Sequence, residues 1–444
     1  MSAAARIALQ RGHRVSGCDL KESSTVSALR ELGCPVHIGH SPDHIQGPDT
    51  IVYSSAIRPD NPELKAARAS GAAVYGRGAF MAELMSDSTN VTVTGSHGKT
   101  TTTWMITSIF MRAGLDPTTA IGGKVPVLGA NCRIGNGQFF ISEADESDGS
   151  FLEFTPDLSI ITNLDREHMD FYRSIHGLEK SILKFMKKTR KHGRLIINGD
   201  DACLKQLAIR SAMDYIDYGI RDECQCRAVE TNLTGGGSEY TLMYHGSDLG
   251  KIHVNAGGDH NISNSLAAVC AAVCADIPLD IIRQSLAEFQ PVSRRFEIRH
   301  ITSDDITIVD DYAHHPTEIR AVLSAALPLK KKRIRVLFQP HRYSRTRLLA
   351  PDFADALSTF DDIVLTDIYA AGEDPMPGVS SGNLLRLIQK ASHPKCRLIR
   401  NLKDAAAYMA ESALPGDLII CMGAGDVKDA SPLITEQLSK PRGI

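Results

Sequence analysis

VTVTGSHGKTTT, residues 91–102, carries the strongest structural signal in this 444-residue chain. A β-branched run ends at a glycine-rich turn, and Lys99 then opens a predicted helix. In such a turn the backbone N–H groups and the helix N-terminus, with roughly +0.5 charge, face the phosphates of a nucleotide, and the lysine adds a positive charge. Val93 stands where the usual G-x-x-x-x-G-K-[ST] pattern has its first glycine. The turn is therefore a compact variant, GSHGKT.

Length and composition restrict the class of protein. At roughly 100–200 residues per domain, the chain predicts two to four domains. The net charge of −3 gives no reason to expect nucleic acid or an acidic membrane surface as partner. We find no apolar run near 18 residues and no secretory signal, so neither a transmembrane helix nor export is expected.

The ten cysteines are scattered and form no C-x-x-C pair. Cys224 with Cys226, and Cys270 with Cys274, are open to interpretation as ligands, but the second pair lies in a helix-like stretch, residues 266–275. We expect structural or unreactive thiols and a cytoplasmic location.

Three blocks are predicted, at residues 1–88, 89–295 and 296–444. The first alternates helices with short strands, which predicts a parallel α/β sheet; the helices are expected at 2–10, 25–32 and 61–69, and the strands at 14–17, 50–54 and 72–75. The second has strands at 139–142, 158–162 and 194–198 and a glycine-rich hairpin at 235–237. The third alternates again, with strands at 306–310, 333–338, 362–366, 396–400 and 418–422.

The first block begins with a helix. A doubly wound domain begins instead with a strand and a glycine-rich turn. We therefore expect either a start codon assigned too late or a truncated domain.

Polar residues follow two predicted strands of the second block. The run EADESD, residues 143–148, places four carboxylates after an apolar strand, which suits a hard cation, although a solvated acidic turn is the alternative. The run NLDREHMD, residues 163–170, follows the next strand and contains His168, which is either a satisfied polar residue or a ligand.

Four further features carry polar or charged side chains. Asn261 and Asn264 either cap the helix that follows or hydrogen-bond a nucleobase, and Arg295 stands where phosphate charge would need a guanidinium group. In DDYAHHPTE, residues 310–318, the adjacent histidines point to different sides, which disfavours a shared metal. In QPHRYSRT, residues 339–346, two arginines three apart either anchor a carboxylate or phosphate or form a solvated basic turn.

Together these motifs resemble the Mur ligase family, the ATP-dependent amide-forming enzymes of peptidoglycan precursor synthesis. The loop GSHGKTTT is similar to the family's GTHGKTTT, with Ser96 in place of threonine. Within the family, EADESD, DDYAHHPTE and QPHRYSRT point to the member that uses L-alanine. The member that recycles murein tripeptide tends instead to carry Tyr at the position of Ser147 and Phe at that of Tyr312. The resemblance spans nearly the whole chain.

The resemblance implies an α/β fold of three domains. These are an N-terminal Rossmann-like UDP-sugar-binding domain that lacks its first strand (1–88), a central P-loop ATPase domain (89–295) and a C-terminal Rossmann-like domain that binds the amino acid (296–444). In the family the missing strand leads into the turn that cradles the UDP diphosphate. If the chain begins here, we expect weaker UDP-sugar binding and unaltered ATP binding.

The implied activity joins L-alanine to the lactyl carboxylate of UDP-N-acetylmuramate through an acyl phosphate, giving ADP and phosphate. ATP and Mg²⁺ are the implied cofactors, with Mn²⁺ as a substitute, and a monomer or weak homodimer is expected. The alternatives are the tripeptide-recycling activity and an ATP-binding regulatory protein without ligase activity.

The resemblance also implies roles for single residues. Lys99, Glu143 and His168 are expected to be catalytic, and the expected metal ligands are Thr100, Glu143 and His168. The expected ATP-binding residues are Gly95, Ser96, His97, Gly98, Lys99, Thr100, Thr101, Asn261, Asn264, Arg295 and Asp311. The residues expected to orient the muramoyl carboxylate and alanine are His314, His341, Arg342 and Arg345.

Overall fold

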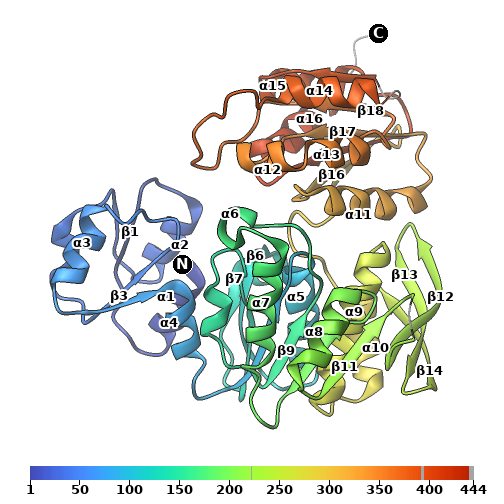
Figure 1. The fold of residues 1–444 in the computed structure, drawn as a ribbon. Helices are drawn as coiled ribbons and strands as arrows, with labels where there is room; N and C mark the ends of the chain where they lie inside the picture. The colour runs from blue at the N-terminus through green and yellow to red at the C-terminus, as the bar shows by residue number, and fades with distance from the viewer. Residues whose placement is uncertain (222, 392–394, 440–444) are drawn as a thin grey trace. The chain divides into compact units, whose positions relative to one another are not determined.

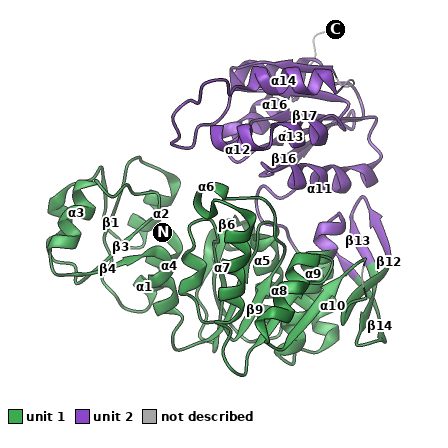
Figure 2. Cartoon of the chain, viewed as in Figure 1, with its two compact units in different colours: residues 1–230, 240–252, 263–289 green, residues 231–239, 253–262, 290–444 purple. Residues whose placement is uncertain are grey.

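The computed structural model describes residues 1–221, 223–391 and 395–439. The chain divides into two compact units (Figure 2). Unit 1 comprises residues 1–230, 240–252 and 263–289, and unit 2 comprises residues 231–239, 253–262 and 290–444. Among the described helices, none combines the length and the apolar character that crossing a membrane requires.

The N-terminal part of unit 1 contains two separate parallel strand pairs (Figure 1). The expected parallel pairing is confirmed, but the expected single sheet is not formed among the described residues. Among the described residues, no strand of this part hydrogen-bonds to both pairs, so they stay separate. The pairs are β1 (Gly17–Asp19) with β2 (Val36–Ile38) and β3 (Thr50–Tyr53) with β4 (Ala73–Gly76). The helices are α1 (Ser2–Gln10), α2 (Ser24–Glu31), α3 (Pro62–Ala69) and α4 (Arg77–Leu84).

One strand of this part was placed wrongly by the sequence. We expected it at residues 14–17, and it lies at Gly17–Asp19. Pairing with β2 begins where Gly17 meets Val36, so the partner strand sets the register. The other expected helices and strands of the block lie within one residue of their predicted bounds at each end.

The central sheet of the chain has ten strands in the order β14-β13-β12-β11-β10-β9-β5-β8-β6-β7. Strand β5 lies between β8 and β9 and runs parallel to both. The predicted strands and the glycine-rich hairpin are confirmed, while β6, β7, β11 and β14 were not predicted. The bounds are β5 (Thr89–Thr94), β6 (Thr118–Val125), β7 (Ala130–Arg133), β8 (Phe139–Glu143), β9 (Leu158–Ile161), β10 (Arg194–Asn198), β11 (Tyr215–Gly219), β12 (Cys226–Thr234), β13 (Gly237–Tyr244) and β14 (Ser247–Val254).

Helices cover both faces of the central strands. On β8, Phe139 meets the edge of Phe110 in α5, with ring centroids 5.0 Å apart. Its neighbour Phe140 points to the other face and joins a buried cluster with Ile182 and Phe185 of α7. The helices are α5 (Lys99–Arg112), α6 (Met169–Tyr172), α7 (Ile175–Met186), α8 (Ala202–Ser211), α9 (Asp259–Cys274) and α10 (Leu279–Ala287). The alternation of strand side chains therefore builds a layer on each face.

The C-terminal sheet of unit 2 has the order β15-β16-β20-β17-β18-β19 and is parallel except for β15. The five expected strands are confirmed within two residues, and β15 (Glu297–Ile301) was not predicted. They are β16 (Thr307–Asp311), β17 (Arg333–Phe338), β18 (Asp362–Leu365), β19 (Lys395–Leu398) and β20 (Asp417–Met422). One buried cluster contains side chains of α11 (Pro316–Ala326), α13 (Ala350–Leu357) and α14 (Ser381–Lys390). Another contains those of α15 (Leu402–Glu411) and α16 (Ala430–Leu438). This is the three-layer arrangement of a doubly wound domain.

Candidate functional site

The glycine-rich turn connects β5 to α5. Gly95 and Gly98 have φ of 125° and 83°, in the region that favours glycine. A Cβ on Gly95 would lie within 3.0 Å of Thr162, and one on Gly98 within 3.0 Å of Asn264 Oδ1. The turn therefore needs glycine at both positions for conformation and for space.

The end of β9 holds this turn in place. Asn163 Oδ1 accepts a hydrogen bond from the backbone N–H of His97 at 2.8 Å, and Thr162 Oγ1 donates to the His97 carbonyl at 2.6 Å. Ser96 Oγ accepts from the Asp165 N–H at 2.8 Å, and His97 Nε2 lies 3.0 Å from Asp165 Oδ2. The neighbouring strand therefore fixes the turn, and the N–H groups of Ser96 and His97 are already bound to Asn163.

Lys99 is the first residue of α5 and faces into the turn. Its Nζ donates to the carbonyls of Gly95 at 2.7 Å and Ser96 at 3.2 Å, and lies 2.9 Å from Glu146 Oε2. Burial lowers the pKa of Lys99, but the charges of Glu146, Asp145 and Glu143 raise it more, so the net pKa lies above its usual value. The ammonium group is therefore a fixed positive charge at neutral pH.

Thr100 and Glu143 meet beside this lysine. Thr100 Oγ1 donates to Glu143 Oε2 at 2.9 Å, and the Gly122 N–H donates to the same oxygen at 2.8 Å. Glu143 is the last residue of β8, and Thr100 and the buried Thr101 lie in the first turn of α5. The structure thus brings together two of the three residues expected to bind a metal.

His168, the third expected ligand, lies with two other carboxylates. Its Nε2 is 3.5 Å from Glu146 Oε1 and 3.6 Å from Glu167 Oε2. One donor atom of each of these three residues lies within 4.8 Å of the others, which is close enough to hold an ion. His168 has φ of 57° and immediately precedes α6, so a left-handed turn directs its ring. Glu146 therefore faces both Lys99 and His168.

The two asparagines lie inside α9, which begins at Asp259. Neither is its N-cap residue, so the capping interpretation is wrong. In unit 1, Asn264 Oδ1 accepts from Thr102 Oγ1 at 3.2 Å and lies beside the turn at Gly98. In unit 2, Asn261 Nδ2 donates to the Gly257 carbonyl at 2.8 Å.

In unit 2, Asp311 ends β16 and is buried. Its carboxylate accepts from the N–H groups of Phe296 and Ala313, both at 2.7 Å. Burial raises the pKa of Asp311 to about 6, although Arg295 and both N–H groups oppose the shift. Arg295 lies 3.9 Å from Glu318, with its guanidinium carbon 5.4 Å from the centre of the Tyr312 ring.

The expected substrate residues of unit 2 follow β16 and β17. The His314 and His341 rings lie 5.7 Å apart, and Arg345 Nη1 lies 3.2 Å from His341 Nδ1. Arg342 has φ of 69° and precedes α12 (Tyr343–Leu348). His315 has a different place from His314, because it is the N-cap of α11 in a capping box with Glu318. This agrees with the prediction that the adjacent histidines point to different sides.

Family models cover most of the chain. The model described as Mur ligase family, catalytic domain matches residues 1–89, Mur ligase middle domain matches residues 93–272, and Mur ligase, glutamate ligase domain matches residues 294–425. This chain belongs to the Mur ligase family.

Relatives of this Mur ligase match it over its length. The UDP-N-acetylmuramate–L-alanine ligase of Sorangium cellulosum is 41% identical over 430 residues, 96% of this chain and 92% of the relative. The ligase of the same name from a Sulfurihydrogenibium species is 38% identical over 441 residues, covering 99% and 96%. The crystal structure of UDP-N-acetylmuramate-alanine ligase from Thermotoga maritima is similar with a TM-score of 0.84 and 27% identity, covering 98% of this chain and 96% of that one.

Sequence reasoning missed four residues in the site of this Mur ligase: Glu146, Asn163, Asp165 and Glu167. All four stand in the polar runs after β8 and β9. The only signal in the sequence was that each polar run follows a strand. This signal identifies the run, but it does not identify which residues within the run belong to the site.

The cysteine pairs of this Mur ligase are not metal clusters. None of the ten cysteines, all of which lie among the described residues, is in a disulfide bond. Within residues 1–221, 223–391 and 395–439, no group of metal-ligating side chains contains Cys224, Cys226, Cys270 or Cys274. The last two lie in α9, as the helix-like composition of residues 266–275 predicted.

Proposed function

We propose that this chain is the ligase that joins L-alanine to UDP-N-acetylmuramate at the expense of ATP, in peptidoglycan precursor synthesis. The observation that carries the proposal is the turn at β5, where Lys99 faces the carbonyls of Gly95 and Ser96 and the carboxylate of Glu146. The names and coverage of the relatives support the choice of substrates. Ten cysteines outside any disulfide bond support a reducing compartment, the cytoplasm.

The turn supplies the phosphate site. The N–H groups of Ser96 and His97 donate to Asn163, so it is the N-terminus of α5 that favours negative charge, and Lys99 neutralises the β- and γ-phosphates. In the free protein its ammonium group is held by the turn's own carbonyls and by Glu146. ATP therefore binds by replacing these contacts with phosphate oxygens.

The donor set fits Mg²⁺ with ATP. Hydroxyl and carboxylate oxygens of Thr100, Glu143, Glu146 and Glu167 are hard ligands, and His168 suits Mn²⁺ as well. When bound, the cation neutralises phosphate charge as it develops. Glu143 and Thr100 already share a hydrogen bond at 2.9 Å, which sets both oxygens at the turn.

The carboxylate must first be phosphorylated, because its own oxygen is a poor leaving group when an amine attacks the carbon. An oxygen of the lactyl carboxylate attacks the γ-phosphorus of ATP, the bond to the β-phosphate oxygen breaks, and ADP leaves. The amine of L-alanine, after losing a proton, attacks the acyl carbon, and phosphate leaves as the amide forms. No covalent bond to the protein is needed, so its residues act by positioning and charge neutralisation.

The remaining proposed contacts are assigned residue by residue. In unit 1 we assign Asn264 to adenine. In unit 2 we assign Asn261 to adenine, Asp311 to the ribose and Arg295 to a phosphate. We assign His314, His341, Arg342 and Arg345 to the muramoyl carboxylate and alanine. The proposed domains are 1–88, 89–295 and 296–444, and the proposed assembly is a monomer or weak homodimer.

An omission assay tests the function. Purified protein with MgATP, UDP-N-acetylmuramate and L-alanine should release ADP and phosphate and form the alanyl amide, detected by mass spectrometry. Leaving out L-alanine should stop amide formation. Product formed from murein tripeptide and not from L-alanine would favour the recycling activity, and ATP binding without any amide would favour the regulatory alternative.

A further inference from the structure

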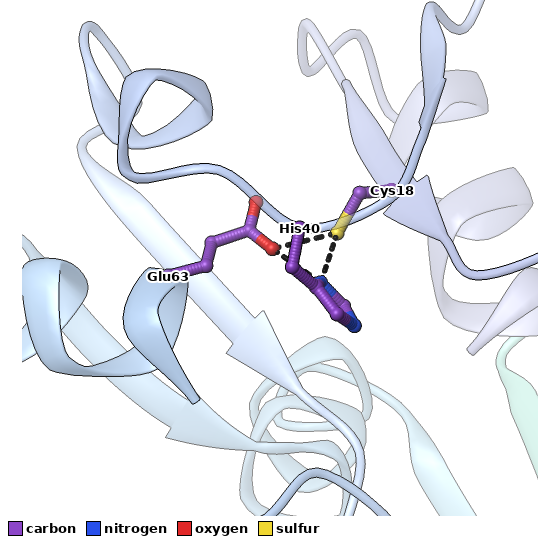
Figure 3. Close-up of side chains that lie close together, drawn as sticks. All are labelled: Cys18, His40 and Glu63. Carbon is purple, nitrogen blue, oxygen red and sulfur yellow. Dashed lines mark hydrogen bonds and ion pairs between the residues drawn. The ribbon is translucent and has the colours of Figure 1, made fainter. Parts of the chain in front are cut away.

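A second group of chemically active side chains lies in the N-terminal part of unit 1, outside the ATP site (Figure 3). Cys18 is in β1, His40 follows β2, and Glu63 is in the first turn of α3. Cys18 Sγ lies 3.3 Å from His40 Nδ1 and 2.9 Å from Glu63 Oε2, and the last two atoms are 2.6 Å apart. Three elements thus converge on one point.

Surrounding residues hold this group. The His40 and Glu63 side chains are 15% and 12% exposed, so the cluster is sheltered but reachable. His44 Nδ1 lies 3.1 Å from the other oxygen of Glu63, and the His37 ring stacks on His44 with centroids 4.4 Å apart. Such outer contacts orient a ligating carboxylate.

We propose that Cys18, His40 and Glu63 bind a Zn²⁺ ion. Thiolate, imidazole and carboxylate are the three ligand types that zinc accepts in proteins, and a thiolate disfavours Mg²⁺ and Ca²⁺. Three protein ligands leave the fourth tetrahedral position for water or another small ligand. The site is therefore of the open kind, near the carboxyl ends of β1 and β2, where open α/β sheets hold ligands.

The donor distances are close to those that zinc requires. With bonds of about 2.0–2.3 Å, tetrahedral donors lie roughly 3.3–3.5 Å apart. The separation of Cys18 Sγ and His40 Nδ1, 3.3 Å, is near this range. The Glu63 oxygen, at 2.9 Å and 2.6 Å from them, must move about 0.4–0.6 Å farther from the first and about 0.7–0.9 Å farther from the second to meet the same separation. Binding of the ion therefore requires a shift of the Glu63 carboxylate.

The proton arrangement favours a metal over a nucleophilic thiol. Burial and the hydrogen bond with Glu63 raise the pKa of Cys18 to about 12, so the free protein holds a thiol there. In a nucleophile–histidine–carboxylate triad the thiol and the carboxylate contact different ring nitrogens. Here both contact Nδ1 of His40, so the ring cannot pass a proton between them. A divalent cation can replace the proton that the three donors share.

Cobalt substitution tests the proposal without any substrate, so its outcome is separate from that of the ligase assay. Protein freed of metal by a chelator is titrated with Co²⁺, whose bond to a thiolate gives a charge-transfer band in the near ultraviolet. We expect the band at one equivalent, its loss on adding Zn²⁺, and its absence in Cys18→Ser. The two other candidate clusters among the described residues contain no cysteine and cannot produce it.

Cys203→Ser is the matched control. Its Sγ also contacts a carboxylate, Glu179 Oε1 at 3.5 Å, and its pKa is also raised to about 12, first by burial. It belongs to no three-donor cluster in the described part of the chain. The band should persist in Cys203→Ser. A wild-type protein without the band, or a band that survives in Cys18→Ser, overturns the proposal.

A second measurement avoids any folding defect of the Cys18 variant. Wild-type protein is alkylated at its thiols with and without Zn²⁺, and the modified peptides are counted by mass spectrometry. Zn²⁺ should slow alkylation of Cys18 at least tenfold and leave that of Cys203 unchanged. Equal rates at Cys18 with and without Zn²⁺ contradict the site.

Discussion

Lys99 is a single residue on which the proposed activity depends. Its Nζ lies 2.9 Å from a carboxylate oxygen of Glu146, whose side chain is 1% exposed. We propose that phosphate oxygens of ATP replace this contact. We predict that Lys99→Ala lowers alanine-dependent ADP release by more than tenfold, because lost phosphate stabilisation should exceed about 1.4 kcal/mol. Steady-state ADP release at saturating substrates is the measurement.

The control for this variant is Lys184→Ala, on the exposed side of α7. It should keep the wild-type rate. Removing Lys99 also leaves the buried carboxylate of Glu146 without this positive charge, which can destabilise the fold. The urea midpoint of each variant is therefore measured first. A folded Lys99→Ala protein that keeps more than about a tenth of the rate refutes the role given to Lys99.

Gly98 tests whether the turn needs its glycine for space. At Gly98 a Cβ would meet Asn264, whereas at Gly114, after the same helix, φ is 74° and nothing lies within 4 Å. Both Gly→Ala changes place alanine in the left-handed region, at about 1–2 kcal/mol. We predict that Gly98→Ala alone also weakens ATP binding at least tenfold, measured by calorimetry. Equal ATP affinities in the two variants contradict this account.

For single residues, the sequence predicted where each motif lies better than it predicted which residues of the motif belong to the site. The position of Lys99 after a β-branched strand follows from local pattern, and the glycines follow from the turn. The choice between Glu143 and Glu146 does not, because both stand in one acidic run. Glu143 ends β8 and reaches Thr100, while the backbone turn after β8 directs Glu146 to Lys99. That turn is set by tertiary packing.

Strands β17, β18 and β20 are held together by a buried charge network. Arg335 of β17 is fully buried and lies 2.8 Å from Asp362 of β18 and 3.5 Å from Asp417 of β20. Removing one partner of a buried pair costs about 3–5 kcal/mol, whereas an exposed pair contributes about 0–1 kcal/mol. The network therefore ties three strands in one register.

We predict that Arg335→Met lowers the free energy of unfolding by about 3–5 kcal/mol in urea titrations. Arg320→Met is the control, because Arg320 and Asp355 form an ion pair at 2.7 Å with both side chains largely exposed. Its effect should stay below about 1 kcal/mol. Adding Asp362→Asn to Arg335→Met should restore part of the loss. Equal losses of unfolding free energy in the two arginine variants would falsify the stabilising role given to the buried network.

The start of α9 and the end of β16 carry two titrating groups that oppose each other. Burial raises the pKa of Asp311 to about 6, while burial, reinforced by Arg295, lowers the pKa of His260 to about 4. Between pH 4 and 6 the folded state keeps the Asp311 proton that the unfolded state has lost, so this group lowers stability as the pH rises. His260 is neutral when folded and protonated when unfolded below pH 6.5, so it raises stability as the pH rises.

Single substitutions should separate the opposite contributions of Asp311 and His260 to the pH dependence of stability. The melting temperature of Asp311→Asn relative to wild type should increase from pH 5 to pH 7.5, and that of His260→Gln should decrease. The Asp311 contribution is up to about 3 kcal/mol, since each pKa unit equals about 1.4 kcal/mol. Each variant controls for the other, and differences that move in the same direction in both would disprove the assignment.

Element prediction succeeded where hydrophobic pattern is strong. Strands β10 and β17 contain runs of buried apolar side chains, and their bounds were predicted to the residue. Strand β6 reads TTAIGGKV and β15 reads EIRHI, with glycine or charge in place of an apolar run. Their pairing partners, β8 and β16, make them strands. Such tertiary dependence is invisible to a local pattern.

At the scale of the molecule, the order of motifs predicted family and function more fully than composition did. Charge and length only excluded classes. The group at Cys18 shows the limit, since scattered cysteines predict unreactive thiols, and only folding brings residues 18, 40 and 63 together. The break of the N-terminal part into two strand pairs was likewise not predicted. This separation into two strand pairs raises the question of whether the protein binds a UDP-sugar as well as ATP.

Ligand-dependent stability answers that question for the whole chain. A ligand at ten times its Kd stabilises the folded protein by about 1.4 kcal/mol. We predict that ATP and UDP-N-acetylmuramate each raise the melting temperature, because they are proposed to bind through different parts of the chain. Lys99→Ala should lose the ATP shift and keep the UDP-N-acetylmuramate shift, while Lys184→Ala keeps both. A wild-type shift with ATP alone would favour the regulatory alternative, and loss of both shifts in Lys99→Ala would make its role structural.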